Sequence, residues 1–304
     1  MIFVFCWARV WIVCQFDLQQ LQPLLEQLRP FERFSPVPLT QLLTYRGSLA
    51  MTFHEPVLVL CILVWAIARG SDVVSGEINR GTLEMLLAQP IARGKLLACH
   101  AAVCVSGLAA LCGLAWLGLY VGIRSNTIVE RQTPTLQLSL PFVPLTLPLP
   151  VGPTTEMRLP LANSVDPAIY LAPSLNLFGF GVFVWGLSVL CSSVDRYRWR
   201  TLGIVIGCYV VQLLLFLLSK ATSATAFCGY LTFLSAYQPD AMVYFADNSP
   251  DRAWWLSVPQ EWATASWPHR LGPLGMTFLL LALGSSFFMG AAFWFRRRDI
   301  PAPL

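Results

Sequence analysis

Long apolar runs without formal charge dominate the pattern of the chain. Four of them cover residues 96–123, 168–194, 201–219 and 272–295. A helix of about 20 apolar residues matches a hydrocarbon core of about 30 Å. We therefore expect each run to be a transmembrane helix. Only a short polar stretch separates the second run from the third, so these two helices should form an antiparallel hairpin.

Two shorter apolar segments precede these runs. The first, residues 2–16, carries Arg9 at its centre, and an unpaired arginine there costs about 2.5–3.5 kcal/mol on the insertion scale. This segment is either a span or an interfacial helix. The second has an apolar centre at 56–68, but its helix can extend over 51–74 if Arg69 and Asp72 reach toward the interface. We expect this one to span, which gives about six transmembrane helices.

Basic residues cluster at one set of connections, whereas the other long polar segments have balanced charge. They occupy the connection between the second and third spans, the hairpin between the fourth and fifth, and the end of the sixth: Arg80, Arg93, Lys95, Arg196, Arg198, Arg200 and Arg296–Arg298. Because cytoplasmic loops carry an excess of Lys and Arg, these connections are predicted to face the cytoplasm. The segments 17–49, 125–167 and 220–271 then face outward.

The outward segment 125–167 contains a proline-rich stretch, PTLQLSLPFVPLTLPLPVGP. Prolines at this density forbid a long helix and favour extended structure. We expect a β-like excursion or loop outside the membrane. The outward segment after the fifth span carries Trp254, Trp255, Trp262 and Trp267, and tryptophan prefers the headgroup region of a bilayer.

Composition supports the membrane assignment. Hydrophobic residues make up 56% of the 304 residues, charged residues make up 12%, and mean hydropathy is +0.62, whereas soluble domains carry about 25% charged residues. The net charge is only +4, and the basic residues are scattered in short clusters, so nucleic acid is not expected as a partner. Eight of the nine cysteines lie in apolar runs without a Cys-x-x-Cys pair, which is typical of small core residues.

The connection after the second span is the most informative part of the sequence. Gly81 permits a turn, Thr82 is a candidate N-cap, and Glu84 suits the positive end of a helix. Pro90 then ends the helix. We expect a short amphipathic helix over 83–88, lying across the membrane face.

This connection resembles a known family. The pattern Gly-Glu-x-x-x-Gly-Thr-Leu-Glu-x-Leu-Leu-x-x-Pro-x-x-Arg over 76–93 is similar to the cytoplasmic signature of ABC-2 type permease subunits, and residues 53–56, 234–239 and 295–300 also look like that family. The resemblance implies that the coupling segment, residues 75–95, contacts a separate ABC ATPase (nucleotide-binding) subunit. The residues carried over to this role are Glu77, Arg80, Gly81, Thr82, Leu83, Glu84, Leu87, Pro90 and Arg93.

The resemblance also implies partners and location. The sequence holds no Gly-x-x-x-x-Gly-Lys-Ser/Thr phosphate loop, since Gly94-Lys95 lacks both the upstream glycine and the following hydroxyl. ATP with Mg²⁺ is therefore expected on the partner subunit, and the chain itself is expected to be a transport subunit without enzymatic activity or cofactor. A homodimer or paired permease in the bacterial cytoplasmic membrane is the expected assembly.

Three other functions compete with this one. An intramembrane enzyme would use His54, His100 or His269, but neither His-Glu-x-x-His nor Gly-x-Ser-x-Gly occurs. An ion-coupled carrier is expected to show carboxylates inside its spans, and the four long runs have none. An assembly or anchoring factor stays open. The sequence predicts an all-α membrane protein, a single permease domain over residues 1–304 with a short cytoplasmic coupling helix and a Pro-rich extracytoplasmic loop.

Overall fold

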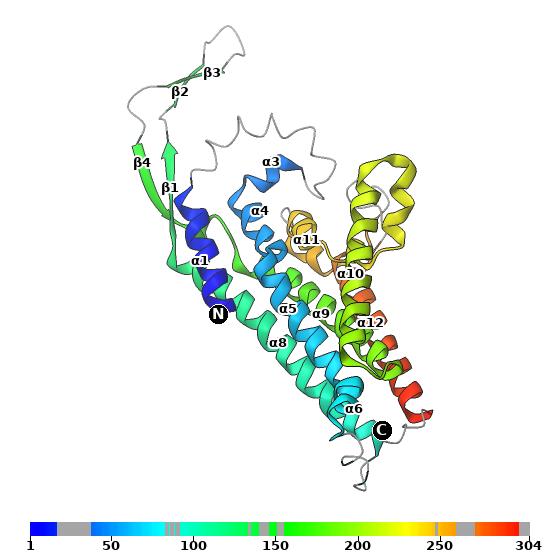
Figure 1. The fold of residues 1–304 in the computed structure, drawn as a ribbon. Helices are drawn as coiled ribbons and strands as arrows, with labels where there is room; N and C mark the ends of the chain where they lie inside the picture. The colour runs from blue at the N-terminus through cyan, green and yellow to red at the C-terminus, as the bar shows by residue number, and fades with distance from the viewer. Residues whose placement is uncertain are drawn as a thin grey trace.

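The computed structural model describes residues 1–16, 38–82, 85, 88, 92–132, 135–139, 146–150, 155–246, 249–259 and 271–297. Long helices run side by side, and a thin β-ribbon extends from one end of the bundle (Figure 1). The long helices are α5 (Pro56–Ser71), α8 (Arg93–Ser125), α9 (Leu171–Val194), α10 (Arg198–Ala221) and α12 (Pro273–Arg297).

Five helical segments in the described part of the chain are long and apolar enough to cross a membrane. They are Tyr45–Arg80, Arg93–Ser125, Pro167–Val194, Arg198–Ala221 and Pro273–Arg297. Each contains, or nearly coincides with, a run predicted to span. The all-α membrane class is therefore confirmed.

The first apolar segment forms α1 (Ile2–Gln15), which has 14 residues. At 1.5 Å per residue it is about 21 Å long, less than the hydrocarbon thickness. It packs against α8, where a Cβ atom on Gly118 would lie 2.6 Å from the carbonyl oxygen of Phe3. Arg9 is paired with Glu55 at 3.0 Å, which relieves much of the cost of placing an arginine among apolar residues. A full crossing by this segment stays a prediction.

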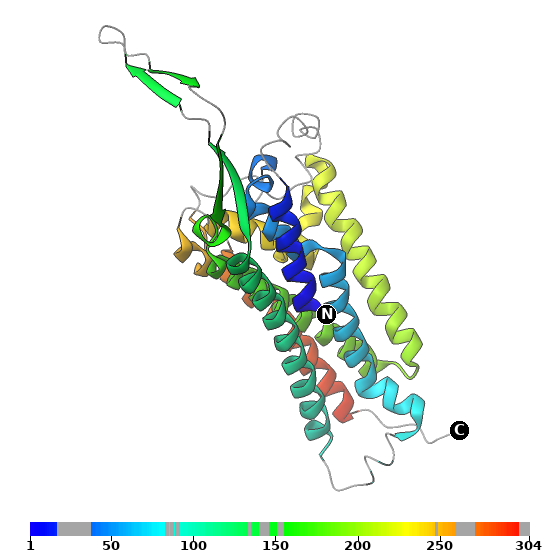
Figure 2. The ribbon, with the colours of Figure 1, turned by 90° about the vertical axis from the view of Figure 1, so that its left-hand side faces the viewer.

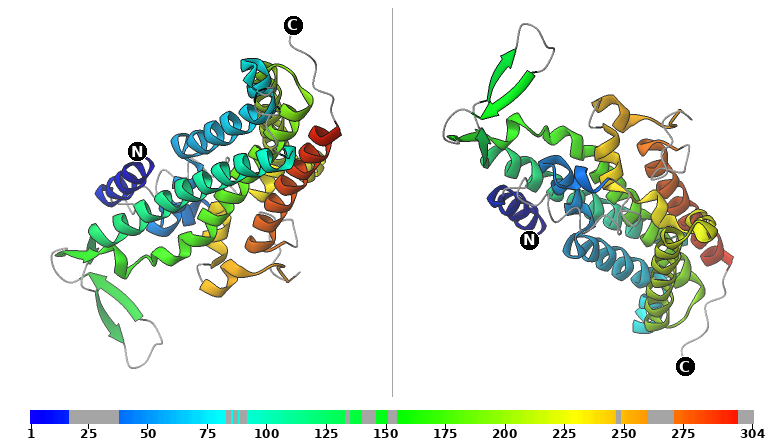
Figure 3. Two further views of the ribbon diagram at one scale, coloured as in Figure 1. Left: turned by 90° about the horizontal axis from the view of Figure 1, so that it is seen from below. Right: turned by 90° about the horizontal axis from the view of Figure 1, so that it is seen from above.

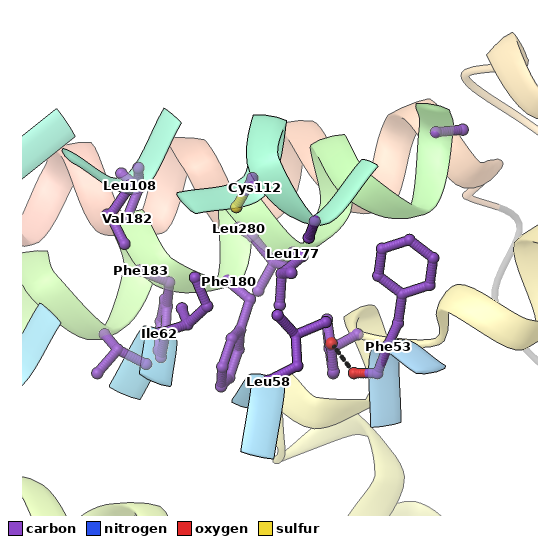
Figure 4. Close-up of a cluster of buried hydrophobic side chains, with 14 of the residues drawn as sticks. Phe53, Leu58, Ile62, Leu108, Cys112, Leu177, Phe180, Val182, Phe183 and Leu280 are labelled. Atoms are coloured by element: carbon purple, nitrogen blue, oxygen red, sulfur yellow. Dashed lines mark hydrogen bonds between the residues drawn. The ribbon is translucent and has the colours of Figure 1, made fainter. Parts of the chain in front are cut away.

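Helix α9 is the centre of the bundle. It packs against α5, α8, α10 and α12, and the views along the bundle place it between them (Figure 3). Phe180 and Leu177 from α9 meet Leu58 of α5 and Leu280 of α12 in the buried core (Figure 4). A helix covered on nearly every side must be apolar all round, which explains the uninterrupted run in this part of the sequence.

Helices α9 and α12 cross with their backbones in close contact. A Cβ atom on Gly186 would lie 2.2 Å from the carbonyl oxygen of Gly284, and one on Gly284 would lie 2.7 Å from that of Val182. Only glycine fits at either position. Small residues let membrane helices pack backbone to backbone, which compensates for the weak hydrophobic driving force between helices in lipid.

The described part of the segment 125–167 forms a β-ribbon, which confirms the expectation of extended structure. Strand β1 (Thr127–Gln132) pairs antiparallel with β4 (Thr155–Pro160), with Ile128 opposite Leu159. Further out, β2 (Thr135–Ser139) pairs antiparallel with β3 (Thr146–Pro150). The ribbon projects far beyond the helices in two perpendicular views (Figures 1 and 2).

Short helices cover the same end of the bundle: α3 (Leu39–Leu42), α4 (Tyr45–Ala50) and α11 (Pro239–Ala246). Two hydrogen bonds fasten the region around α11 to the start of α5. The Tyr237 hydroxyl donates to the carbonyl oxygen of Phe53 at 2.6 Å, and His54 Nε2 lies 2.9 Å from Asp240 Oδ1. Burial raises the pKa of Tyr237 well above its usual value, so the phenol stays neutral and keeps donating.

The opposite end of the bundle holds the basic connections. Helix α5 continues through a π-helical turn, Asp72–Gly76, into α6 (Glu77–Arg80). This end lies far from the β-ribbon (Figure 2), as the predicted orientation requires. Trp262, Trp267, His269 and Arg298 lie outside the described residues.

Candidate functional site

The turn of the coupling segment begins where α6 ends. Gly81 adopts φ +71° and ψ 7°, a left-handed conformation, and its N–H donates to the carbonyl oxygen of Ile78. Glycine pays no Cβ penalty in this conformation and is the usual residue just past a helix C-terminus. The predicted turn at Gly81 is confirmed.

Arg80 brings two carboxylates together beside this turn. Its Nη1 donates to Asp72 Oδ1 at 2.8 Å and its Nη2 donates to Glu77 Oε1 at 2.7 Å. One guanidinium fork thereby holds acidic groups from the π-helical turn and from α6. The Arg80 side chain is 42% exposed, so each pair contributes at most about 1 kcal/mol to stability, and its main effect is to fix the geometry.

Thr82 closes the far side of the turn. Its hydroxyl donates to a carboxylate oxygen of Glu77 and lies 3.3 Å from the carbonyl oxygen of the same residue. The hydroxyl thus points back toward α6. Glu77 accepts from both Arg80 and Thr82, and this locks the residues before and after Gly81 into one unit.

The connection between α9 and α10 reaches the same cluster. Arg198 Nη1, in the first turn of α10, lies 3.5 Å from Asp72 Oδ1. Within that connection, Asp195 accepts hydrogen bonds from the backbone N–H groups of Arg196 and Tyr197 at 2.7 and 3.2 Å and pairs with Arg200 at 3.2 Å. The coupling segment is therefore linked to α10 as well as to α5.

The far end of the segment is fastened to the last helix. Arg93, the first residue of α8, donates from Nη1 to the carbonyl oxygen of Phe295 at 3.1 Å, and its guanidinium lies 5.7 Å from the centre of the Phe295 ring. The last carbonyl groups of a helix lack partners within the helix. A cation at this position satisfies one of them and also suits the negative end of α12.

The structure thus brings together four of the predicted coupling residues, Glu77, Arg80, Gly81 and Thr82, and places Arg93 at the other end of the connection. Leu83, Glu84, Leu87 and Pro90 lie outside the described residues, so the short amphipathic helix over 83–88 stays a prediction. Between them, Met85 is described and is 73% exposed, which leaves apolar surface available to a partner.

Sequence reasoning missed one member of this cluster and left the role of another unspecified. The sequence pattern predicts only that Asp72 reaches toward the interface, and it gives Arg198 no role beyond setting orientation. Their ion pair spans 126 positions of the chain, and no local pattern reports a contact at that range. The sequence indicates only that a carboxylate and an arginine at the same predicted depth of the membrane both need partners. It does not indicate that they pair with each other.

Comparison with known proteins identifies the family. The family model described as "ABC-2 family transporter protein" matches residues 15–299. No curated protein and no solved structure matches the chain. The match includes the coupling segment and the five helices that are long and apolar enough to span. The chain belongs to the ABC-2 transporter family and is a membrane permease component of an ABC transporter.

Proposed function

We propose that this permease couples ATP hydrolysis, carried out by a separate ATPase subunit, to export of a substrate across the bacterial cytoplasmic membrane. The observation that supports this most directly is the connection around Gly81. Arg80 and Thr82 tie both sides of the turn to Glu77, so the connection resists bending. A rigid connection can transmit a push from a partner, whereas a floppy one would absorb it.

The transmission route follows the contacts of Asp72. Its carboxylate accepts from Arg80 at 2.8 Å and faces Arg198 of α10 at 3.5 Å. A displacement of α6 would therefore move the cytoplasmic ends of α5 and α10 together. Arg93 carries the same displacement to α12 through Phe295. In this mechanism, closure of the ATPase subunits drives the helices between inward-open and outward-open arrangements.

The proposed assembly pairs this permease with a second copy or with another permease. ABC ATPase subunits form nucleotide sites between two copies, so each copy needs a membrane partner. ATP and Mg²⁺ would be held there, because this chain has no phosphate loop. The exposed Met85 and the charged surface of α6 are the contact proposed for the ATPase subunit.

The test is a substitution on the exposed surface of the coupling segment that breaks no contact described within the chain. Met85→Glu places a charge on a residue that is 73% exposed, and Met157→Glu makes the same change on the outer ribbon, where the residue is 51% exposed. We expect Met85→Glu to lower recovery of the ATPase subunit from solubilised native membranes by at least about tenfold, equivalent to about 1.4 kcal/mol. Met157→Glu should leave recovery unchanged. Equal recovery with the two variants would refute the proposal.

A further inference from the structure

A buried hydroxyl of α9 is inserted into the backbone of the helix that leads to the coupling segment. Over Asp72–Gly76 the hydrogen-bond ladder changes from α to π. The N–H groups of Val74 and Ser75 donate to Ser192 Oγ at 3.3 and 2.9 Å, and Ser192 Oγ lies 3.2 Å from the carbonyl oxygen of Ser71. One hydroxyl offers one proton and two lone pairs. Two accepted bonds and one donated bond use all three, and Ser75 Oγ lies a further 3.0 Å from Ser192 Oγ.

This serine lies in a wholly buried polar cluster. Ser75 Oγ donates to the carbonyl oxygen of Ser71 at 2.8 Å and lies 3.2 Å from Thr201 Oγ1 at the start of α10. Ser71, Ser75, Ser192 and Thr201 are all 0% exposed. The cluster therefore joins α5, α9 and α10 at one level, one turn before α6.

The π-helical turn decides which way the coupling residues face. It adds one residue to the turn, and one residue corresponds to about 100° of rotation in an α-helix. Without it, Glu77 and Arg80 would be rotated by about that angle relative to the buried face of α5. Such π-bulges recur at functional sites, and an inserted side chain is a recognised cause of a break in the helical ladder.

Gly76 gives independent support for this geometry. A Cβ atom there would lie 2.4 Å from Asp72 Oδ1. The Asp72 carboxylate is thus folded against the turn, and from this position it reaches Arg80 at 2.8 Å. The inserted Ser192 hydroxyl and the absence of a side chain at Gly76 both allow the π-helical turn to form.

We infer that Ser192 is a positioning residue of the coupling segment: its hydroxyl holds the π-helical turn, and the turn directs Glu77 and Arg80 toward the ATPase subunit. This inference rests on the proposed function. Ser192 itself is buried, so it acts through the backbone of residues 71–75 and through the Ser75 hydroxyl.

The experiment compares Ser192→Ala with Ser188→Ala. Ser188 is an equally buried serine of α9 whose hydroxyl donates to the carbonyl oxygen of Ile67 at 3.2 Å, before the π-helical turn. Binding of the purified ATPase subunit to each variant in nanodiscs is measured by titration. We expect Ser192→Ala to weaken binding at least about tenfold and Ser188→Ala to change it less than about twofold. Ser192→Thr, which keeps the hydroxyl, should restore binding.

A second pair of variants perturbs the same turn without touching the serine. Gly76→Ala forces Asp72 off the turn, whereas Gly203→Ala on α10 adds a methyl group where nothing lies within 4 Å. Gly76→Ala should weaken binding as Ser192→Ala does, and Gly203→Ala should not. This pair decides the matter if Ser192→Ala fails to fold.

The outcomes separate this inference from the proposed function. If Met85→Glu abolishes binding while Ser192→Ala and Gly76→Ala bind normally, the inference is overturned and the proposed function stands. Equal losses with Ser188→Ala and Ser192→Ala would also overturn it, because the effect would then be general destabilisation. Normal binding by Met85→Glu would overturn both, since the coupling segment would not be the contact.

Discussion

We predict that replacing His54 with alanine destabilises the protein, because the buried Asp240 carboxylate then loses its hydrogen-bond partner. The Asp240 side chain is 2% exposed, and its Oδ1 lies 2.9 Å from His54 Nε2, which belongs to a side chain that is 35% exposed. Leaving a buried acceptor without its partner costs about 1–3 kcal/mol, and more when it is charged. Because His54 is a third exposed, water reaches the vacated side, and we expect a loss of about 2 kcal/mol.

A double-mutant cycle isolates this contact. Asp240→Asn removes the charge while keeping the shape, so the combined variant His54→Ala with Asp240→Asn should lose less than the sum of the two single losses, by about 1 kcal/mol. Thermal unfolding of the purified chain in nanodiscs is the assay, and for 304 residues about 2 kcal/mol corresponds to a drop of about 3 °C. An unchanged melting temperature for His54→Ala, or strictly additive losses, would refute the reasoning.

Three further outcomes follow from the structure. Gly186→Ala should destabilise the chain by about 1–3 kcal/mol, because its Cβ atom would lie 2.2 Å from a carbonyl oxygen of α12, whereas Gly207→Ala in open space should not; thermal unfolding compares them. Tyr237→Phe should lower the free energy of unfolding by about 1 kcal/mol. Burial raises the pKa of Tyr237 in the folded state, so the stabilisation by its hydroxyl is complete below about pH 10 and falls as pH rises above that. The phenylalanine variant should lack this alkaline loss of stability. With membrane-impermeant maleimide, cysteines introduced at Met85 and Met157 should react from opposite faces of sealed vesicles.

The spans were predictable because the bilayer imposes a requirement that local sequence reports directly. A helix must hide its backbone polar groups, so length and apolarity are sufficient evidence. The Pro-rich excursion was predictable for a similarly local reason, since proline excludes helix wherever it occurs at that density. The partner of Arg9 was not predictable. Glu55 meets it across 46 positions, a distance at which the linear pattern carries no signal.

The candidate site also has one part that local sequence predicts and one part that it does not. The turn at Gly81 follows from the conformational freedom of one residue and the absence of a Cβ atom. The π-helical turn does not follow from any local preference of Asp72–Gly76, because its cause is a hydroxyl on another helix, 117 positions beyond Ser75. Serine occurs throughout apolar spans as a small packing residue, so nothing in the sequence distinguishes Ser192 from Ser188.

A re-entry turn between two spans would need far less than this end of the molecule contains. A left-handed glycine and a few exposed polar residues would suffice, and the exposed ion pairs of Arg80 add at most about 1 kcal/mol each. The buried hydroxyl cluster beneath them has a larger effect on stability, because every unpaired polar group in an apolar interior costs several kcal/mol. The hydroxyl groups of Ser75, Ser192 and Thr201 avoid that cost because each lies within hydrogen-bond distance of another member or of the Ser71 carbonyl oxygen. Such an arrangement stabilises one orientation of α6, and the proposed contact with an ATPase subunit would require a defined orientation.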